Sequence, residues 1–279
     1  MQAITPESYH DDLRHISKSG IDIILKSPQH FYNRYYCSDK RKDSAAFAAG
    51  RALHVALSEP QKFQDLYIVA PGKIDGRTRE GKQRIEAFDR AAQGKIVIPE
   101  MPLNKDAKSR VLSYEQVMRM RDAVFSHPIA SMLMLAGEAE KVITWIDDIT
   151  GAPCKAMLDW LPKAAGGNFV LDFKSTEDAS EEGFAKSVRN FHYARQDAHY
   201  INGLAATTGL HYKMIFVVVE KHPPYSVELY ALTPERRQEA QSDIQQALER
   251  YIECQTAYNK TGDAGVWYGY NKLKTVKLI

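Results

Sequence analysis

Two short apolar segments, each carrying an acidic residue inside a strand-like pattern, constrain the fold more than any other feature of this chain. Residues 157–162 read Met-Leu-Asp-Trp-Leu-Pro and residues 169–174 read Phe-Val-Leu-Asp-Phe-Lys, with two glycines in the stretch between them. Both segments have the composition of β-strands, and the stretch between them is turn-like. Because side chains alternate along a strand, Asp172 and Lys174 project from the same face. If the segments are neighbouring strands, Asp159 can join them at one point.

Acidic side chains on buried strands are unfavourable unless they are paired or bind a metal. A divalent cation would account for them, since Mg²⁺ prefers carboxylate oxygens, and Lys174 could then stabilise a developing negative charge or help to activate water. An ion pair between aspartate and lysine at the open end of a sheet explains the spacing equally well. The two interpretations stay open on these residues alone.

Composition narrows the class of protein. The 279 residues can bury a substantial core, and the formal net charge is only +2, so a nucleic-acid partner would need local basic patches. No apolar run approaches the length of a membrane span, and the N-terminus lacks the pattern of a secretion signal. The three cysteines are far apart and form neither a disulfide framework nor a CxxC pair, which predicts a reducing cytoplasm.

The order of patterns along the chain predicts the architecture. Helical patterns come first, followed by a hairpin over residues 138–162, a third strand over residues 169–173, helices, two further strands and a long helix from Pro234. This order indicates an α/β protein, bordering on α+β, with a mixed central sheet flanked by helices. We expect a helical N-terminal part (about residues 1–135) and a sheet core (about residues 136–260).

Two expected helices carry pairs of residues that share one face. In the alanine-rich helix over residues 44–57, His54 follows Gly50 by four positions, so a small residue leaves room beside the imidazole. Taken alone, a core histidine with a satisfied hydrogen bond is the favoured interpretation. In residues 195–204, Gln196 and Tyr200 are also four apart.

Glu140, at the start of the hairpin, either faces the same point as the aspartates or is a solvent-facing strand end, and the second is favoured. The aromatic residues of a helix expected over residues 29–36 are predicted to be core.

Basic residues gather in three places. Residues 71–84 are polar and basic, including Arg77 and Arg79, and form either a mobile loop over a phosphate backbone or a solvated face; a helix is expected over residues 83–92. Near an N-terminal helix start stand Ser17, Lys18, Ser19 and, further on, Arg34. Hydroxyls and cations there bind phosphate well, although a capping serine and solvated bases explain them too. The tail from residue 267 is aromatic and basic, and includes Lys274 and Lys277.

Four features now follow one another in order. They are Gly50-xxx-His54 on a helix, Asp159 on a strand, Asp172-Phe173-Lys174 on the next strand and Gln196-xxx-Tyr200 on the helix after it. In this order the chain resembles the RecB-like branch of the PD-(D/E)xK nuclease superfamily, and within it the RecE-type exonucleases (exodeoxyribonuclease VIII of prophages). The resemblance covers nearly the whole chain, including an opening of the Ser-x-Ser and Ser-Pro-x-x-Phe-Tyr type. It implies a restriction-endonuclease-like core in a single nuclease domain over residues 1–279.

The chain departs from the family pattern at one position, since Leu158 and not proline precedes Asp159, which is a common variation. The absence of a cysteine quartet speaks against the iron–sulfur relatives of the same branch.

The resemblance also implies roles for individual residues. It assigns metal binding to His54, Asp159, Asp172 and the carbonyl of Phe173. Lys174 would position and activate the attacking water or stabilise the phosphate, and Gln196 and Tyr200 would orient Lys174 or the substrate phosphate. The cofactor would be Mg²⁺ or Mn²⁺, and an imidazole beside carboxylates suits Mn²⁺ better.

The function implied is a metal-dependent exodeoxyribonuclease that degrades double-stranded DNA from its ends, 5′-to-3′, in recombination by end resection and strand annealing. The resemblance further implies a ring-shaped homo-oligomer working beside a RecT-like single-strand annealing protein, in the cytoplasm and encoded by a bacterium or phage. Ser17, Lys18, Ser19 and Arg34 would be candidates for a 5′-phosphate pocket, and Arg77 and Arg79 for contacts with DNA.

Three alternatives stay open. An endonuclease or a single-strand nuclease would use the same site. A non-catalytic DNA-end-binding module would keep the fold, although every residue of the expected site is chemically competent. A small-molecule phosphohydrolase would leave the basic loop and tail unexplained.

Overall fold

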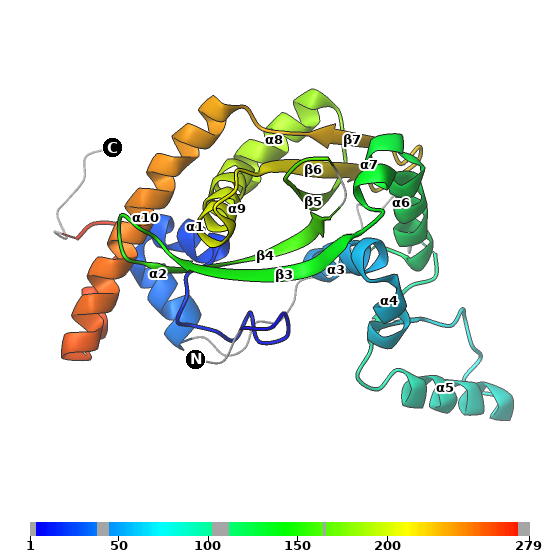
Figure 1. Ribbon diagram of the computed structural model, residues 1–279. Coiled ribbons are helices and arrows are strands. Elements are labelled where there is room, and N and C mark those ends of the chain that lie inside the picture. Colours follow the sequence, from blue (N-terminus) through cyan, green and yellow to red (C-terminus); the bar gives the residue numbers. More distant parts are fainter. Residues whose placement is uncertain (1–3, 38–44, 102–111, 164–165, 273–279) are drawn as a thin grey trace.

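A mixed five-stranded sheet lies at the centre of the computed structural model, with helices on both faces (Figure 1). The structure describes residues 4–37, 45–101, 112–163 and 166–272. In spatial order the strands are β3 (Gly137–Ile146), β4 (Pro153–Pro162), β5 (Phe169–Thr176), β6 (Lys213–Glu220) and β7 (Val227–Tyr230). Only β5 and β6 pair in parallel; the other neighbours in this sheet are antiparallel. The predicted fold class, an α/β protein with a mixed sheet, is confirmed.

The parallel pair requires a crossover, which is made by α8 (Glu181–Phe191) and α9 (Tyr193–Thr208). The two helices are separated by His192, whose φ of 54° places it in the left-handed region. Behind them runs α10 (Pro234–Thr261), which begins with Thr233 as its N-cap and ends at Gly262 with φ 67°. The predicted long helix from Pro234 is confirmed.

One face of the sheet is covered by α9 and α10, together with α1 (Lys18–Lys26) and α2 (Pro28–Tyr32) from the start of the chain. The helix α9 approaches β3 closely at Gly203, where an added Cβ would stand 2.5 Å from the Trp145 ring. Glycine is therefore needed at this crossing to let the helix lie down on the strand.

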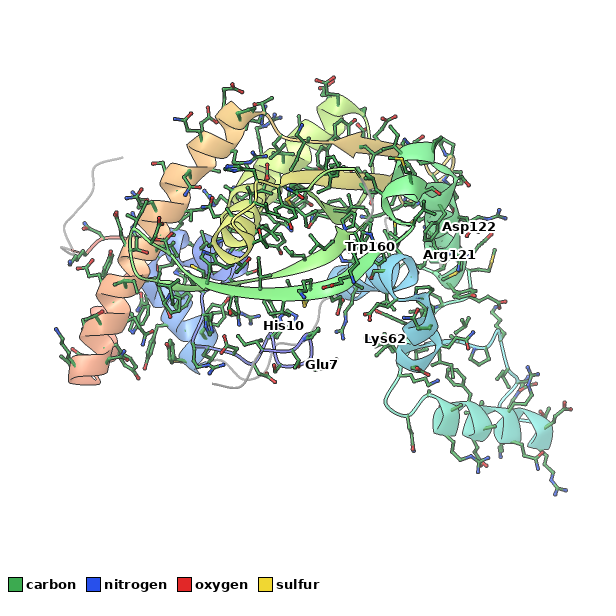
Figure 2. The ribbon with its side chains drawn as sticks, viewed as in Figure 1. Glu7, His10, Lys62, Arg121, Asp122 and Trp160 are labelled. Atoms are coloured by element: carbon green, nitrogen blue, oxygen red, sulfur yellow. The ribbon has the colours of Figure 1, made fainter. Side chains whose placement is uncertain are left out.

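The opposite face is covered by α3 (Ala45–Ser58), α4 (Pro60–Leu66), α6 (Tyr114–Ser126) and α7 (Pro128–Leu133). Side chains of β5 alternate between the two cores as predicted: Val170 packs with the first core, whereas Leu171 and Phe173 pack with the second. Side chains fill the layers between the sheet and the helices on both faces (Figure 2). Helices from the first 135 residues thus contribute to both cores.

A small unit projects from this body, at the lower right of Figure 1. It consists of the parallel strands β1 (Tyr67–Val69) and β2 (Ile96–Ile98) with α5 (Arg79–Ala91) between them. The helix starts four residues earlier than predicted because Thr78 caps it, accepting a hydrogen bond from Gly81 N at 2.9 Å. Of the two interpretations of residues 71–84, the mobile loop is wrong from Arg79 on, where α5 begins, and the mostly exposed side chains fit the commoner interpretation, a solvated face.

The aromatic residues near the N-terminus belong to a core, as predicted. The π-helical turn η1 (Asn33–Cys37) continues α2, and the rings of Phe31, Tyr32 and Tyr36 surround Trp267, which is 2% exposed. Trp267 follows the short 3₁₀-helix η2 (Ala264–Val266). Lys274 and Lys277 of the predicted basic tail lie outside the described residues. Within the described ranges, no helix combines the length and apolar character needed to cross a membrane.

Candidate active site

The two aspartates lie at the point where β4 and β5 separate. The strands are antiparallel with Trp160 opposite Leu171, and the same register places Asp159 opposite Asp172. Asp159 Oδ2 accepts a hydrogen bond from the main-chain N of Phe173 at 2.9 Å. A side chain thus replaces the main-chain acceptor that a continuing ladder would supply, which explains why the strands can part here without leaving this donor unsatisfied.

Asp172 is almost completely buried, at 1% exposed. Gln196 Nε2 from α9 donates a hydrogen bond to its Oδ1, and Lys174 Nζ forms an ion pair with its Oδ2. Within the described residues, this buried oxygen has no hydrogen-bond partner besides its contact with the Lys174 ammonium. Burial raises the pKa of Asp172 to about 6, although the ammonium of Lys174 acts in the opposite direction. Burial would lower the pKa of Lys174, but the carboxylates of Asp172 and Asp159 and the Tyr193 side chain together outweigh it, so that pKa is raised.

His54 reaches the same point from α3. Its Nε2 donates to the main-chain oxygen of Phe173 at 2.8 Å, and its Nδ1 lies 3.4 Å from Asp159 Oδ2. Burial disfavours the charged imidazole, but the Asp159 carboxylate outweighs it and raises the pKa of His54. Burial likewise disfavours the Asp159 carboxylate, but the charges of His54 and Lys174 lower its pKa. The histidine is satisfied by hydrogen bonding, but its partners belong to the candidate site. A Cβ added at Gly50, one turn earlier, would meet no atom within 4 Å in the part of the chain that the structure describes.

Tyr200 lies one turn after Gln196 on α9, as predicted, and burial raises its pKa well above the usual value while a hydrogen bond with Gln196 acts against this. Sequence reasoning missed Tyr193, whose ring lies 4.7 Å from Lys174 Nζ in a cation–π contact. The spacing Tyr193-xx-Gln196-xxx-Tyr200 places all three residues on one face of α9 and would have been the signal.

Glu140 also lies at the site, so the favoured interpretation of a solvent-facing strand end is wrong. The register of β3 on β4 places it opposite Asp159, and its φ of 46° interrupts the regular strand. Burial raises the pKa of Glu140, and the carboxylates of Glu59 and Asp159 add to this effect. A positive φ at a residue other than glycine is unfavourable by about 1 kcal/mol, and such strain is concentrated at functional sites.

The structure separates the candidate DNA contacts into two groups. Lys18 lies at the edge of the site, where it pairs with Asp22 at 2.8 Å and its Nζ donates to the main-chain oxygen of Phe191 at 2.8 Å. Burial lowers the pKa of Lys18, and the charge of Lys174 adds to this effect. Ser17 caps α1, Ser19 is exposed in its first turn, and Arg34 is half-buried in η1.

Arg77 and Arg79 belong to the projecting unit. Arg77 is 91% exposed and pairs with Asp75 at 3.0 Å, and Arg79 begins α5 (Figure 1). The structure therefore does not bring these two arginines together with the carboxylates.

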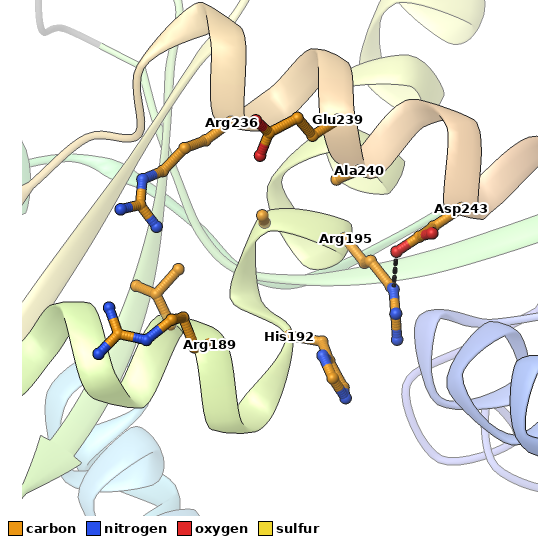
Figure 3. A pocket seen from close by; sticks show the side chains of 9 residues that line it. Arg189, His192, Arg195, Arg236, Glu239, Ala240 and Asp243 are labelled. Carbon is orange, nitrogen blue, oxygen red and sulfur yellow. Dashed lines mark hydrogen bonds and ion pairs between the residues drawn. The ribbon is translucent and has the colours of Figure 1, made fainter. Parts of the chain in front are cut away.

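Two cavities adjoin α8. The first, about 300 Å³, lies between α8, α9 and the start of α10, where Arg195 pairs with Asp243 at 2.8 Å (Figure 3). None of the predicted site residues lines it. The second, about 330 Å³, runs from Lys174 along the end of β5 and the length of α8 to Lys221. Of the predicted site residues, Lys174 lines this second cavity.

The donor chemistry of the cluster fits a divalent cation. Two carboxylates, an imidazole and the Phe173 carbonyl lie near one another, and within the described residues the Lys174 ammonium is the partner of the buried oxygen Asp172 Oδ2. As the side chains stand, no group of three or more His, Cys, Asp and Glu residues in the described part of the chain is close enough to hold a metal. Asp172 is directed toward Lys174 and Gln196, so a cation would compete with the lysine for this carboxylate and with the proton for His54. That these residues hold a metal stays a prediction.

Comparisons with known proteins bear on the fold and the family of the chain. No curated protein matches the chain. In shape, the chain is similar to a crystal structure from Eubacterium rectale described as a "Putative exonuclease", with a TM-score of 0.61 and 13% identity over 92% of this chain and 88% of that one. A second structure, called SSO0001, has 11% identity over 92% of this chain and 90% of that one, and its TM-score of 0.33 is too low to carry an argument. The model of the family described as "PDDEXK-like domain of unknown function (DUF3799)" matches residues 17–266. The chain therefore belongs to this PDDEXK-like family, and its five-stranded sheet with flanking helices is a PD-(D/E)xK core.

Proposed function

We propose that the protein is a metal-dependent exodeoxyribonuclease that degrades double-stranded DNA from its ends. One observation carries the proposal: Asp159 and Asp172 stand opposite each other where β4 and β5 part, with Lys174 paired to Asp172. Two carboxylates and an ammonium at the end of a buried strand pair are the groups that hydrolysis of a phosphodiester needs. Membership of the PDDEXK-like family supports the same chemistry.

His54, Asp159, Asp172 and the Phe173 carbonyl are the groups that would hold the metal. When bound, a divalent cation neutralises phosphate charge and lowers the pKa of water near it. Mn²⁺ suits the mixed imidazole and carboxylate donors, and we expect it to support activity.

Lys174 supplies a positive charge to the site, and Gln196 and Tyr200 hold the neighbouring groups in position. Lys174 is fixed between the carboxylate of Asp172 and the ring of Tyr193, and its raised pKa keeps it cationic toward a phosphate oxygen. Gln196 orients Asp172 through Oδ1, which leaves Oδ2 on the side of Lys174. Tyr200 supports Gln196 from the next turn of α9.

The finer parts of the proposal rest on the resemblance to RecE-type exonucleases. These are 5′-to-3′ polarity, a role in recombination, a ring-shaped oligomer, a RecT-like annealing partner and a cytoplasmic site of action in a bacterium or phage-infected cell. Lys18, beside the cluster, supports a phosphate contact near Ser17 and Ser19, with Arg34 as a more distant candidate. For Arg77 and Arg79, on the projecting unit, the proposal requires DNA to extend beyond the sheet.

The test is digestion of linear duplex DNA beside covalently closed circles, in Mg²⁺ or Mn²⁺, by the wild type, Asp172→Asn and Lys174→Met. We expect loss of linear DNA only, abolished by both substitutions and supported by Mn²⁺, and labels at each end would then give the polarity. Asp197→Asn serves as the control. Asp197 follows Gln196 on α9 and is 0% exposed, but it is paired with Arg237 and lies outside the cluster, so cleavage should persist.

Other outcomes would contradict the proposal in different ways. Cutting of circles would indicate an endonuclease, and activity confined to unpaired strands would indicate a single-strand nuclease. Metal-dependent binding to DNA ends without cutting would indicate a binding module. Activity only in Mg²⁺ would argue against His54 as a ligand.

A further inference from the structure

An aromatic surface continues from the candidate catalytic lysine to solvent. The ring of Tyr193, which lies against Lys174 Nζ, stacks on the ring of Phe191 with centroids 5.6 Å apart and planes at 25°. Phe191 is 58% exposed. One face of its ring is thus covered by Tyr193, while much of the ring is left in contact with water beside a site that carries strong charges.

The backbone holds this surface in place. Residues two apart on a regular helix do not face each other, and Phe191 and Tyr193 stack because His192 between them has a φ of 54°. A left-handed residue other than glycine is unfavourable, so the turn has to be stabilised by its surroundings. Lys18 contributes by donating a hydrogen bond to the main-chain oxygen of Phe191 at 2.8 Å.

The cavity of about 330 Å³ lies along the same elements. Lys174, Phe191 and Tyr193 line it, and Phe184 adds a further aromatic wall. The lining face of α8 also carries Lys186, Ser187 and Asn190. The first two lie one helical turn after Gly183, and Asn190 lies two turns after it. The acidic residues at the far end are engaged: Glu177 pairs with Lys221 at 3.0 Å and with His222 at 3.3 Å, and Asp178 accepts from the main-chain N of Ser180.

We infer that this cavity receives the nucleobase of the nucleotide next to the phosphodiester that faces Lys174, with Phe191 as the stacking surface; this inference rests on the proposed function. Stacking on an aromatic ring recognises any base through its π-face, and the hydroxyl of Ser187 and the amide of Asn190 can bond to base edges. The continuity of the cavity with Lys174 places base and phosphate on adjoining surfaces, as one nucleotide requires.

A cavity of this kind discriminates between paired and unpaired nucleotides. A base inside a duplex is paired and stacked on both sides, so it can enter the cavity only after unpairing, which is least unfavourable at a strand end or in a single strand. The cavity would therefore favour terminal nucleotides over internal ones, without any device that recognises the terminal phosphate.

Binding without cleavage tests the inference. Fluorescence anisotropy in the presence of EDTA would compare a labelled hairpin duplex that has one blunt end with versions that carry an abasic tetrahydrofuran nucleotide at the 5′ or the 3′ position of that end, because internal bases of the duplex stay paired and cannot replace the missing base. For the wild type, we expect one of the two abasic probes to bind about tenfold more weakly than the intact one. For Phe191→Ala, intact and abasic probes should bind alike.

Two further variants complete the comparison. Phe191→Trp keeps a stacking surface and should keep the dependence on the terminal base. Phe125→Ala removes a Phe that is 41% exposed on α6 and lies outside the cavity lining, and it should behave as wild type. Equal binding of all probes by the wild type, or the same loss from the abasic nucleotide in wild type and Phe191→Ala, would overturn the inference.

The outcome is independent of the test of the proposed function. Cleavage of linear DNA without any dependence on the terminal base would leave the nuclease standing and refute the base cavity. Base-dependent binding through Phe191 in a protein that never cleaves DNA would support the base cavity and refute the nuclease.

Discussion

Two buried lysines on neighbouring strands show how similar surroundings can serve different purposes. Lys155 on β4 and Lys174 on β5 each lie 4.7 Å from the centre of a tyrosine ring, and each forms an ion pair with an aspartate. The type of partner does not distinguish them, and both side chains are largely withdrawn from water, at 5% exposed for Lys155 and 16% for Lys174.

The two differ in how far the ammonium group is satisfied. Lys155 Nζ donates to the main-chain oxygens of Tyr9 at 2.6 Å and Asp12 at 2.5 Å, and lies 3.4 Å from Asp12 Oδ2. Its three donors are engaged, and they fasten the N-terminal segment to β4. Lys174 is paired with Asp172 alone among charged groups within ion-pair distance in the described residues, and no main-chain oxygen there is a further acceptor for its Nζ. The incomplete set, and not burial itself, distinguishes the candidate catalytic lysine from the structural one.

The largest effect expected from this comparison is on activity. Lys174→Met should lower cleavage of linear DNA by at least about 10²-fold, since it removes a charge that faces the phosphate, whereas stability should change little because Asp172 can take up a proton. Single-turnover cleavage and urea denaturation, measured on the same preparation, check both parts. Full activity in this variant would remove Lys174 from the chemistry.

The matched substitution Lys155→Met should act on stability. It leaves the main-chain oxygens of Tyr9 and Asp12 without this donor, while the Asp12 carboxylate keeps its contacts with Arg14 and His15. Leaving buried acceptors unsatisfied destabilises by about 2 kcal/mol. The shift in urea midpoint gives the size, and the folded fraction should cleave at close to the wild-type rate. A variant that folds as stably as wild type would show that this brace is not needed.

The surroundings of Lys155, the structural lysine, also predict that stability depends on pH. His199 on α9 is 1% exposed and its Nε2 donates to the main-chain oxygen of Lys155 at 3.1 Å. Burial lowers the pKa of His199 to about 4, while the hydrogen bond to the Lys155 oxygen acts in the opposite direction. Because the unfolded chain takes up this proton near pH 6.5, the free energy of unfolding should fall as pH drops from 6.5 toward 4.

The size of this contribution between pH 8 and pH 5 is about 2 kcal/mol for a shift of this kind. His199→Gln keeps a donor without titrating in this range, so the difference between wild type and variant isolates the histidine. Urea denaturation at several pH values measures it, and parallel pH profiles for the two proteins would refute the assignment.

The smallest effect concerns Gly50, in the helix that carries His54. An added Cβ there meets no atom of the described residues within 4 Å, so Gly50→Ala should stabilise the helix by about 0.5–1 kcal/mol. If the open space is used by DNA, cleavage should decrease although stability rises. A gain in stability with unchanged cleavage would show that the space beside His54 is not part of the substrate path.

The candidate site was predicted from sequence as far as local pattern allows. Alternation along β5 separates Asp172 and Lys174 from Phe173, and helical spacing pairs Gln196 with Tyr200; both arrangements depend only on residues a few positions apart. The roles given to these residues came from the resemblance and stay predictions. Glu140 was misjudged because its direction depends on a positive φ within the strand, for which no neighbouring residue gives a signal.

By itself, the sequence determined the mixed α/β architecture, the strands that carry the two aspartates and the helix that begins at Pro234, because period, composition and capping residues act over one or two turns. Only the tertiary structure decided that β4 and β5 part at the aspartates and that the Tyr193 ring lies against Lys174. It also decided that the Lys155 ammonium has three acceptors, whereas the Lys174 ammonium is paired with the carboxylate of Asp172. The hydrogen-bond partners of a buried charge come from segments far apart in the chain, such as Gln196 and Asp172, and the strand register and helix crossings that bring them together are fixed only when the whole core packs.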